Sequence, residues 1–462
     1  MIIQKPKIGL LPLYLKLYDD VLPKIKSEFL PFLNLITAKF ENKGVDVVSS
    51  EICRIATEFD LAIRQFEKDE VDCIVTIHLA YSPSLESIDV LSKTRLPLLV
   101  LDTTPDICFD SMSKLMHNHG IHGVQDMCNL LIRRSKKFII EAGHIDESDV
   151  IDRLICHIKG AQIARKIKHS HVGRIGEPFA GMGDFIVDSS VLEKETGIKT
   201  GIFHPEQIAN YLAEITDAEV TAEIDIDKNR FDLSRVSPNA HALSVRTGLA
   251  LRRWINEEKL SAFTINFQHI TLAHKLPVMP FLEICKAMSR GIGYAGEGDA
   301  LTASLVGSLA SVLGNVSFTE MFCPDWKNNI IFLSHMGEIN IDLTEDMPVL
   351  IEKEWDFTDA QAPVYPSACF KKGEAVFVNL APGPNDTFTL ILSPVEMVKE
   401  LYPENMGDGI RGWMKPCMAI GDFLKAYSEA GGTHHAAIVY GQMIDVLKSF
   451  GRIMEWEIAE IK

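Results

Sequence analysis

Residues 71–102 read VDCIVTIHLAYSPSLESIDVLSKTRLPLLVLD, and the alternation of segments around this stretch decides the fold. Its two apolar runs, at 71–79 and 96–102, have the length and composition of buried strands. Upstream, the same kind of run occurs as KIGLLPLY (7–14) and VDVVSS (45–50). Residues 51–69, EICRIATEFDLAIRQFEKD, have the apolar spacing of an amphipathic helix. Strands that alternate with helices predict a doubly wound parallel sheet.

The ligand edge of such a sheet lies at the carboxyl ends of its strands. The residues at the predicted ends are Leu13, Tyr14, His78, Tyr81, Asp102 and Thr103.

The rest of the chain shows two further patterns of predicted secondary structure. A helical stretch over about 148–169 leads into a second alternating block. The predicted strands of this block are HVGRIGEPF (171–179), TGIFH (200–204), EVTAEIDI (219–226) and AFTINF (262–267). From about Asn315, antiparallel strands are predicted in VSFTEMF (316–322), NIIFLSHMGEINI (329–341), GEAVFVNLA (373–381) and DTFTLILSP (386–394), and a helix in residues 434–451.

We therefore predict an α/β fold with three domains. An N-terminal α/β domain covers 1–168, a central α/β domain covers 169–313, and a mainly antiparallel β domain with a terminal helix covers 314–462. A chain of 462 residues is too long for one ordinary hydrophobic core, which agrees with several domains.

Composition excludes several classes of protein. The net charge is −17, without the clustered Lys and Arg that nucleic-acid binding needs. No run approaches the roughly 18 apolar residues of a membrane span. The start of the chain lacks the features of a signal peptide, so we expect a cytoplasmic protein. The nine cysteines are scattered and form no C-x-x-C pair, which predicts reduced thiols.

Glycines suggest two loops of interest. GRIGEPFAGMGDF (173–185) does not match the G-x-G-x-x-G phosphate motif because Ile186 stands where the third glycine would be, so we interpret it as a plain strand-to-helix loop.

In GYAGEGD (293–299), Asp299 is placed to cap the following helix. Glu297 lies between two glycines that permit close backbone approach. Capping alone explains this loop, and a cation site or proton transfer is the alternative.

Three more positions combine a carboxylate or an imidazole with an apolar run. In a strand, Glu320 shares a face with Val316, Phe318 and Phe322, and a carboxylate there is costly to bury unless it is protonated, paired or bound to metal. A solvent-exposed strand end is the alternative for Glu320. His335 ends an apolar run, where a core histidine is more common than a metal ligand. The pair His434 and His435 follows Gly-Gly-Thr at a predicted helix start, which chance could also explain.

Taken together, two glutamates and two histidines suit a divalent metal with open coordination positions, Mn²⁺ more readily than structural Zn²⁺. Two open positions can accept the neighbouring hydroxyl and carbonyl oxygens of a sugar.

Four ordered motifs resemble the L-arabinose isomerase family and, more distantly, L-fucose isomerase. They are GYAGEGD followed by Thr302-Ala303, SF-x-E at 317–320, SHM-x-E at 334–338 and GG-x-HH at 431–435. Weaker similarity includes His78 with Tyr81-Ser82-Pro83, and His122-Gly123.

This resemblance implies the roles of named residues. The metal ligands would be Glu297, Glu320, His335 and His435, and the two glutamates would be the acid/base pair. The implied substrate-binding residues are Phe267, Tyr81, Met182, His119, His122, Tyr14 and His434. The resemblance also implies Mn²⁺ (or another divalent metal) and a homo-oligomer, trimer or hexamer, with active sites at subunit interfaces.

One position departs from the family pattern. Leu11 stands in LPLY (11–14) where the family has the glutamine of a Q-x-L-Y segment that contacts the sugar. Sites that hydrogen-bond a hydroxyl discriminate strongly among analogues, so the missing amide predicts an altered sugar preference.

The resemblance implies an aldose–ketose isomerase that acts through an enediol on an L-arabinose-like pentose. Two alternatives stay open: a deoxyhexose isomerase of the L-fucose isomerase kind, and a non-catalytic sugar-binding protein of the same fold. A metallohydrolase has no support, because neither G-x-S-x-G nor H-E-x-x-H occurs.

Overall fold

The computed structural model describes residues 3–462, which form two compact units. The N-terminal unit contains Gln4–Arg165 and Lys448–Ile453. The C-terminal unit contains Lys166–Leu447 and Met454–Lys462. The division into domains 1–168, 169–313 and 314–462 stays a prediction.

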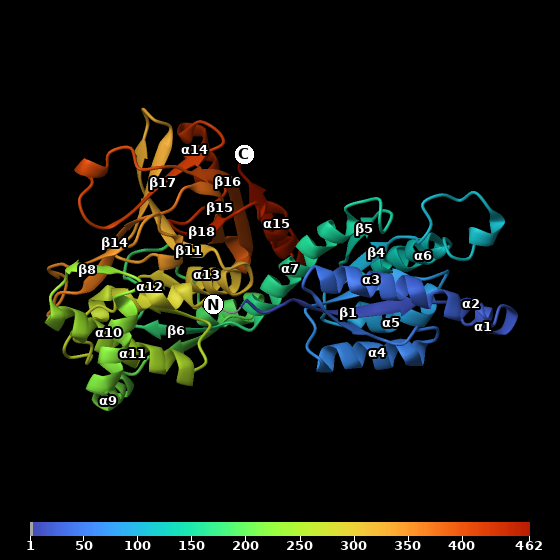
Figure 1. Cartoon of the computed structure of the whole chain (residues 1–462), viewed down its shortest axis with the longest axis horizontal. Coiled ribbons are helices and arrows are strands. Elements are labelled where there is room, and N and C mark those ends of the chain that lie inside the picture. The colour runs from blue at the N-terminus through green and yellow to red at the C-terminus, as the bar shows by residue number, and fades with distance from the viewer. Residues whose placement is uncertain (1–2) are drawn as a thin grey trace. The chain divides into compact units, whose positions relative to one another are not determined.

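The N-terminal unit is built on a parallel sheet with strand order β2-β1-β3-β4-β5 (Figure 1). Its strands are β1 (Lys7–Leu13), β2 (Asp46–Ser49), β3 (Cys73–His78), β4 (Leu98–Asp102) and β5 (Ile139–Ala142). Its helices are α1 (Leu17–Val21), α2 (Ile25–Glu28), α3 (Leu30–Asn42), α4 (Ala56–Lys68), α5 (Ser84–Lys93), η1 (Met112–Lys114), α6 (Gly120–Arg133) and α7 (Val150–Lys168), the last of which continues into the C-terminal unit. This arrangement confirms the predicted doubly wound sheet.

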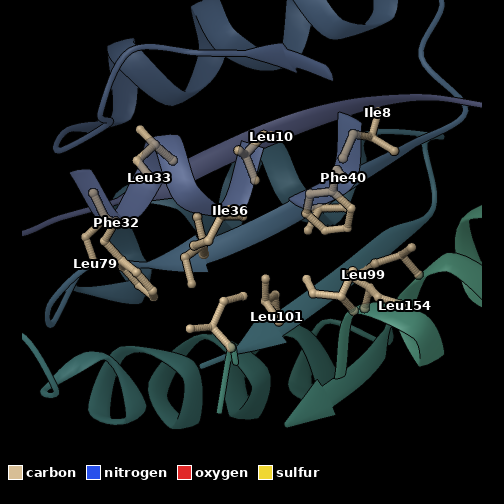
Figure 2. Close-up of a cluster of buried hydrophobic side chains, with 14 of the residues drawn as sticks. Ile8, Leu10, Phe32, Leu33, Ile36, Phe40, Leu79, Leu99, Leu101 and Leu154 are labelled. Atoms are coloured by element: carbon tan, nitrogen blue, oxygen red, sulfur yellow. The ribbon is translucent and has the colours of Figure 1, made fainter. Parts of the chain in front are cut away.

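Helices cover both faces of this sheet because strand side chains alternate between them. On one face, Ile8 and Leu10 of β1 pack with Phe40 of α3 and Leu154 of α7 (Figure 2). The opposite face packs Leu11 and Leu13 against side chains of α4, α5 and α6. Leu11 is fully buried in this second cluster.

The C-terminal unit contains two sheets. Its strands are β6 (His171–Ile175), β7 (Lys199–Ile202), β8 (Asp232–Arg235), β9 (Ala262–Ile265), β10 (Gly293–Gly296), β11 (Val316–Asp325), β12 (Ile330–Ser334), β13 (Val349–Glu352), β14 (Val364–Cys369), β15 (Gly373–Pro382), β16 (Phe388–Met397), β17 (Ile410–Pro416), β18 (His435–Tyr440) and β19 (Glu457–Glu460). Its helices are α8 (Ser189–Val191), η2 (Leu192–Thr196), α9 (Pro205–Glu214), α10 (Asp217–Asp227), α11 (Pro238–Glu257), η3 (Phe267–His269), α12 (Phe281–Ser289), α13 (Ala300–Leu313), η4 (Ile341–Leu343), η5 (Pro384–Asp386), η6 (Pro403–Asn405), α14 (Ile420–Glu429) and α15 (Ile444–Ile453), the last of which continues into the N-terminal unit. No helix within residues 3–462 combines the length and apolar character that a bilayer crossing requires.

One sheet is parallel with strand order β10-β9-β6-β7, and the other is mainly antiparallel. In the larger sheet, β16, β15, β18, β11, β12 and β17 are neighbours in that order, and β16 also pairs with β17. This extra pairing closes the six strands into a barrel, which removes their free edges. The predicted second α/β block and antiparallel β block are both confirmed.

Helix α13 lies between the two sheets of the C-terminal unit. It contacts β6, β9 and β10 on one side and β11, β15 and β18 on the other. Its sequence, ALTASLVGSLASVL, has no charged residue, as expected for a helix that is buried on nearly all sides. The first turn of α13 therefore lies where the parallel sheet and the barrel meet.

Two sequence-based assignments are wrong. EVTAEIDI (219–226) belongs to helix α10 rather than to a strand. Thr216 and Glu219 form a capping box that starts this helix, and the buried residues Val220, Glu223 and Asp227 follow helical spacing. The strand prediction rested on the alternation of apolar and polar residues in this segment. It assumed that carboxylates such as Glu223 would be exposed, whereas Glu223 is buried.

The second error concerns residues 434–451, which were predicted to be one helix. His435–Tyr440 form strand β18, and the helix begins only at Ile444. Every residue of β18 is buried between β11 and β15, so the segment lacks the polar face that distinguishes an amphipathic helix. The chain also continues beyond this helix into β19.

Candidate active site

Strand register brings Glu320 beside two of the histidines. Glu320 of β11 pairs with His435, the first residue of β18, and on its other side with Ser334, the last residue of β12. His335 follows Ser334 directly, and its Nε2 lies 3.8 Å from Glu320 Oε2. A register shift between Met321 and Cys323 interrupts the pairing after this point. That irregularity explains why Phe322 is exposed although it was predicted to share the buried face of Glu320.

Glu297 approaches the same histidines from the parallel sheet. It follows β10 in the left-handed backbone region, with φ 60°, between two glycines. Its Oε2 lies 3.7 Å from His435 Nε2 and 3.6 Å from His434 Nε2. A Cβ on Gly296 would lie 2.7 Å from Cε1 of His335, so a glycine is needed there for the close approach.

The potential ligand atoms form two overlapping groups that share His435. Glu320, His335 and His435 form one group, and Glu297, His434 and His435 form the other, with ligand atoms within 4.8 Å of one another in each. The structure thus brings together all four predicted ligand residues, and His434 with them. The exposed side-chain fractions of 12% for Glu297 and 21% for Glu320 leave both carboxylates accessible to a small molecule.

In both predicted ligand histidines, the ring nitrogen Nδ1 is hydrogen-bonded to a carboxylate. His335 Nδ1 donates to Glu338 Oε2 (2.7 Å), and His435 Nδ1 donates to Asp299 Oδ2 (3.0 Å). Asp299 also caps α13 by accepting from the Thr302 backbone N–H, which confirms the capping interpretation. A carboxylate on Nδ1 fixes the tautomer and orientation of the ring and leaves Nε2 free for a ligand.

Aromatic rings complete the surroundings. The ring of Phe318 lies 4.9 Å from that of His335 and 5.1 Å from that of His435. Phe185 stacks on His435 with an interplanar angle of 18°. Both phenylalanines are buried, so they exclude water from the inner side of the histidines.

Burial and neighbouring charges move the two glutamate pKa values in opposite directions. Burial raises the pKa of Glu320, and the nearby histidines offset this only in part. Burial also acts to raise the pKa of Glu297, but His434 and the other histidines outweigh it and lower the pKa. Burial acts to lower the pKa of His434, but Glu297 and Asp184 raise it to about 9. Carboxyl groups with different proton affinities are suited to separate acid and base roles.

The donor set fits a divalent cation. His435 Nε2 is buried and has no hydrogen-bond partner within residues 3–462, which is costly unless another group binds it. Two carboxylates and two imidazoles, the latter oriented through Nδ1, match the ligand types that Mn²⁺ and similar ions accept. Glu297, Glu320, His335 and His435 are the residues that would hold the ion.

The remaining predicted site residues are divided between the two units. Phe267, Met182 and His434 belong to the C-terminal unit, whereas Tyr14, Tyr81, His119 and His122 belong to the N-terminal unit. Their roles in binding substrate stay predictions.

In the C-terminal unit, Phe267 belongs to an aromatic cluster with Phe179 and Phe357, at ring distances of 5.5 and 5.1 Å. The cluster adjoins Glu297 through the backbone N–H of Phe179, which donates to the Glu297 carbonyl (2.9 Å). Met182 lies in the glycine-rich loop, partly exposed.

In the N-terminal unit, the predicted residues lie near the carboxyl ends of the strands. His119 and His122 have ring centroids 4.3 Å apart, and Tyr81 donates to Asp126 (3.2 Å). Tyr14 is buried after β1. Leu11 packs in the core of this unit, so its side chain is not placed to contact a sugar.

Sequence reasoning did not assign the supporting roles of three residues. Glu338 follows His335 by three positions, a local signal that could have identified it. The contact of Asp299 with His435 has no local signal. Asp184, in the loop interpreted as plain, accepts from His434, which is 250 positions away in the chain.

Comparison with known proteins agrees with this geometry. The family model of the L-arabinose isomerase central domain matches residues 188–315, and that of the L-arabinose isomerase C-terminal domain matches residues 315–457. L-arabinose isomerase of Geobacillus kaustophilus is 23% identical over 430 residues, which cover 90% of this chain and 84% of that protein. L-arabinose isomerase 2 of Bacillus licheniformis is 24% identical and covers 86% of this chain and 85% of its own.

Among solved structures, a periplasmic solute-binding protein of Actinobacillus succinogenes with bound D-allose matches at 14% identity, covering 67% of this chain and 92% of that chain. Its TM-score is 0.17, too low to support an argument about fold or function. The two family models together match more than half of the chain. The chain therefore belongs to the L-arabinose isomerase family of aldose–ketose isomerases.

Proposed function

We propose that this isomerase interconverts an L-arabinose-like aldopentose and the corresponding 2-ketose. The observation that carries the proposal is the convergence of Glu297, Glu320, His335 and His435 in one unit of a chain from this family. The curated relatives are L-arabinose isomerases and align with most of the chain, which supports a pentose as substrate.

We further propose that the site works with Mn²⁺ or a similar divalent ion. Glu297, Glu320, His335 and His435 would hold the ion, which when bound would supply Lewis-acid polarisation of the sugar carbonyl group. His335 and His435 would keep their orientation through Glu338 and Asp299, so that the chain itself holds the donor atoms ready.

The two glutamates move the protons. In the aldose-to-ketose direction, one carboxylate removes the proton from C2 and returns it to C1. The other carboxyl group passes the O2 proton to O1, which gives an enediol path. A positioned acid or base of this kind contributes roughly 10²–10⁴-fold to the rate.

An aldose panel tests the function directly. Protein stripped of metal and then supplied with Mn²⁺ is assayed with L-arabinose, other pentoses, hexoses and L-fucose. We expect the highest kcat/KM with a pentose of L-arabinose-like configuration. A higher kcat/KM with L-fucose would replace the pentose by a deoxyhexose. Sugar binding with no turnover of any aldose would favour a non-catalytic binding protein.

Isotope transfer tests the enediol path. Aldose that carries tritium at C2 should lose part of its label to water during isomerisation, because a carboxylate-bound proton exchanges with solvent. Complete retention of tritium at C1 of the ketose would contradict the enediol path and indicate a hydride shift.

We also propose a cytoplasmic homo-oligomer, trimer or hexamer, in which each active site draws residues from two subunits. The support is the family resemblance, in which some of the pocket positions matched by Tyr81, His119 and His122 come from a neighbouring subunit. Mixed oligomers of the E320Q and H122A variants should regain part of the activity that each lacks alone, since some sites would be complete. Sedimentation velocity measures the oligomeric state, and a monomer with full activity would contradict shared sites.

A further inference from the structure

Asp184 makes a contact that the isomerase assignment leaves unexplained. Its Oδ2 accepts two hydrogen bonds from His434, one from the backbone N–H (2.9 Å) and one from Nδ1 (2.6 Å). The carboxylate therefore fixes both the start of β18 and the ring of His434.

His434 repeats the arrangement of the two predicted ligand histidines. In each of the three, a carboxylate holds Nδ1 and leaves Nε2 facing a glutamate. The pairs are Glu338–His335, Asp299–His435 and Asp184–His434. For His434, Nε2 lies 3.6 Å from Glu297 Oε2. A chain of contacts thus runs from Asp184 through His434 to Glu297.

We propose that Asp184 is a positioning residue for the isomerase, acting through His434 to orient the carboxylate of Glu297. This inference rests on the proposed function. Glu297 follows β10 in a left-handed turn, and the ion-pair partners of its carboxylate are His434 and His435. Both histidines contact the same oxygen, Glu297 Oε2. Because His435 is one of the predicted metal ligands, His434 is the histidine left to orient this oxygen.

The loop has a separate anchor, so loss of the Asp184 carboxylate should leave the fold intact. Phe185 is buried and stacks on His435, whereas 39% of the Asp184 side chain is exposed. Replacement of Asp184 should therefore free the ring of His434 without removing the packing that holds the loop.

Four variants of the full chain test the role: D184A, D184N, H434A and the double variant D184A/H434A. D184A should lower kcat at saturating Mn²⁺, and weaken Mn²⁺ binding measured by calorimetry without sugar, by about 10–100-fold in each case, as is typical for groups that orient metal ligands. D184N should retain most of the wild-type values because its carbonyl oxygen can still accept both hydrogen bonds.

The double variant separates positioning from general structural damage. If Asp184 acts through His434, adding D184A to H434A should change kcat little further. D188A is the matched control. Asp188 caps the short helix α8 four residues further along by accepting hydrogen bonds from Ser190, so this variant should keep wild-type kcat and Mn²⁺ affinity.

The possible failures are distinguishable. Wild-type protein that neither turns over an aldose nor binds Mn²⁺ would overturn the proposed function and this inference with it. Active wild-type protein with an unchanged D184A variant would overturn the role of Asp184 alone. So would multiplicative losses in the double variant, or a D184N variant as impaired as D184A.

Discussion

Glu320 shows how one residue can be suited to chemistry by its place in a sheet. It is mostly buried, its pKa is raised by that burial, and its nearest charged neighbours are histidines. A carboxylate in such surroundings is costly to keep without a partner. A carboxylate is tolerated at this position because its side chain stays partly accessible and because His335 lies close to it.

The first prediction concerns this residue. The E320Q variant should lose turnover by at least about 10²-fold, since an amide cannot exchange protons as a carboxylate does. The shape of the side chain is unchanged, so cooperative thermal unfolding should remain. Steady-state assays with Mn²⁺ and a melting curve measure the two effects.

Glu396 provides the matched control. It is an exposed glutamate on β16 of the same unit, and E396Q should keep full activity. Near-normal turnover of E320Q would contradict the catalytic role of Glu320.

His78 gives a second prediction at this scale. Its ring is buried in the N-terminal unit, neither nitrogen has a hydrogen-bond partner within residues 3–462, and burial lowers its pKa from 6.5 to about 3. The unfolded chain therefore binds a proton at a higher pH than the folded chain. Stability from neutral His78 is complete above pH 6.5 and is lost as the pH falls toward 3, by up to about 1.4 kcal/mol per pH unit.

Urea unfolding between pH 7 and pH 5 measures this effect. The H78L variant should lose less stability over that interval than wild type, whatever its stability at pH 7. An equal pH dependence in both proteins would show that His78 is not the group responsible.

At the scale of elements, buried charges join α10, α11 and α12. Lys286 of α12 is 3% exposed and contacts Glu223 and Asp227 of α10. Arg252 of α11 bridges Glu223 and Glu283, at 2.7 Å from each carboxylate. The network holds one helical layer of the C-terminal unit together by charge as well as by apolar packing.

The third prediction tests this network. The K286M variant should lose about 3–5 kcal/mol of unfolding free energy, because it leaves buried carboxylates without their cation. Urea unfolding followed by tryptophan fluorescence gives the change. K228M, at the exposed end of α10, is the control and should change stability by less than about 0.5 kcal/mol.

A K286M variant as stable as K228M would mean that the remaining partners, Arg252 and His241, satisfy the carboxylates on their own.

At the scale of the whole molecule, a bound metal would join the parallel sheet to the barrel. Glu297 follows a strand of the parallel sheet, and the other predicted ligands lie at the ends of barrel strands or within them. An ion held by both should therefore stabilise the C-terminal unit as well as support turnover.

The fourth prediction follows from this placement. Treatment with a chelator should abolish isomerase activity and lower the melting temperature, and Mn²⁺ should restore both. At a free concentration 100-fold above its Kd, an ion that binds only the folded state stabilises it by about 2.7 kcal/mol. Full activity in a preparation shown to be metal-free by elemental analysis would contradict the metal role.

Local patterns in the sequence were sufficient for much of the fold. The parallel sheets were predictable because β1, β3 and β4 are continuous apolar runs next to helices with regular spacing. The same reasoning failed for α10, whose buried carboxylates depend on Lys286 and Arg252. It also failed for β18, because a segment that is buried on every side shows no regular alternation of polar and apolar residues.

The sequence by itself determined which groups were available: the glutamates and histidines, the glycines around Glu297, and the cap at Asp299. Only the tertiary structure decided that they meet. The pairing of β11 with β12 and β18 places Glu320 beside His335 and His435, and a loop 250 positions away in the chain supplies Asp184 to His434. Strand register and long-range contacts depend on the burial of whole faces of the sheet, which no short stretch of sequence specifies.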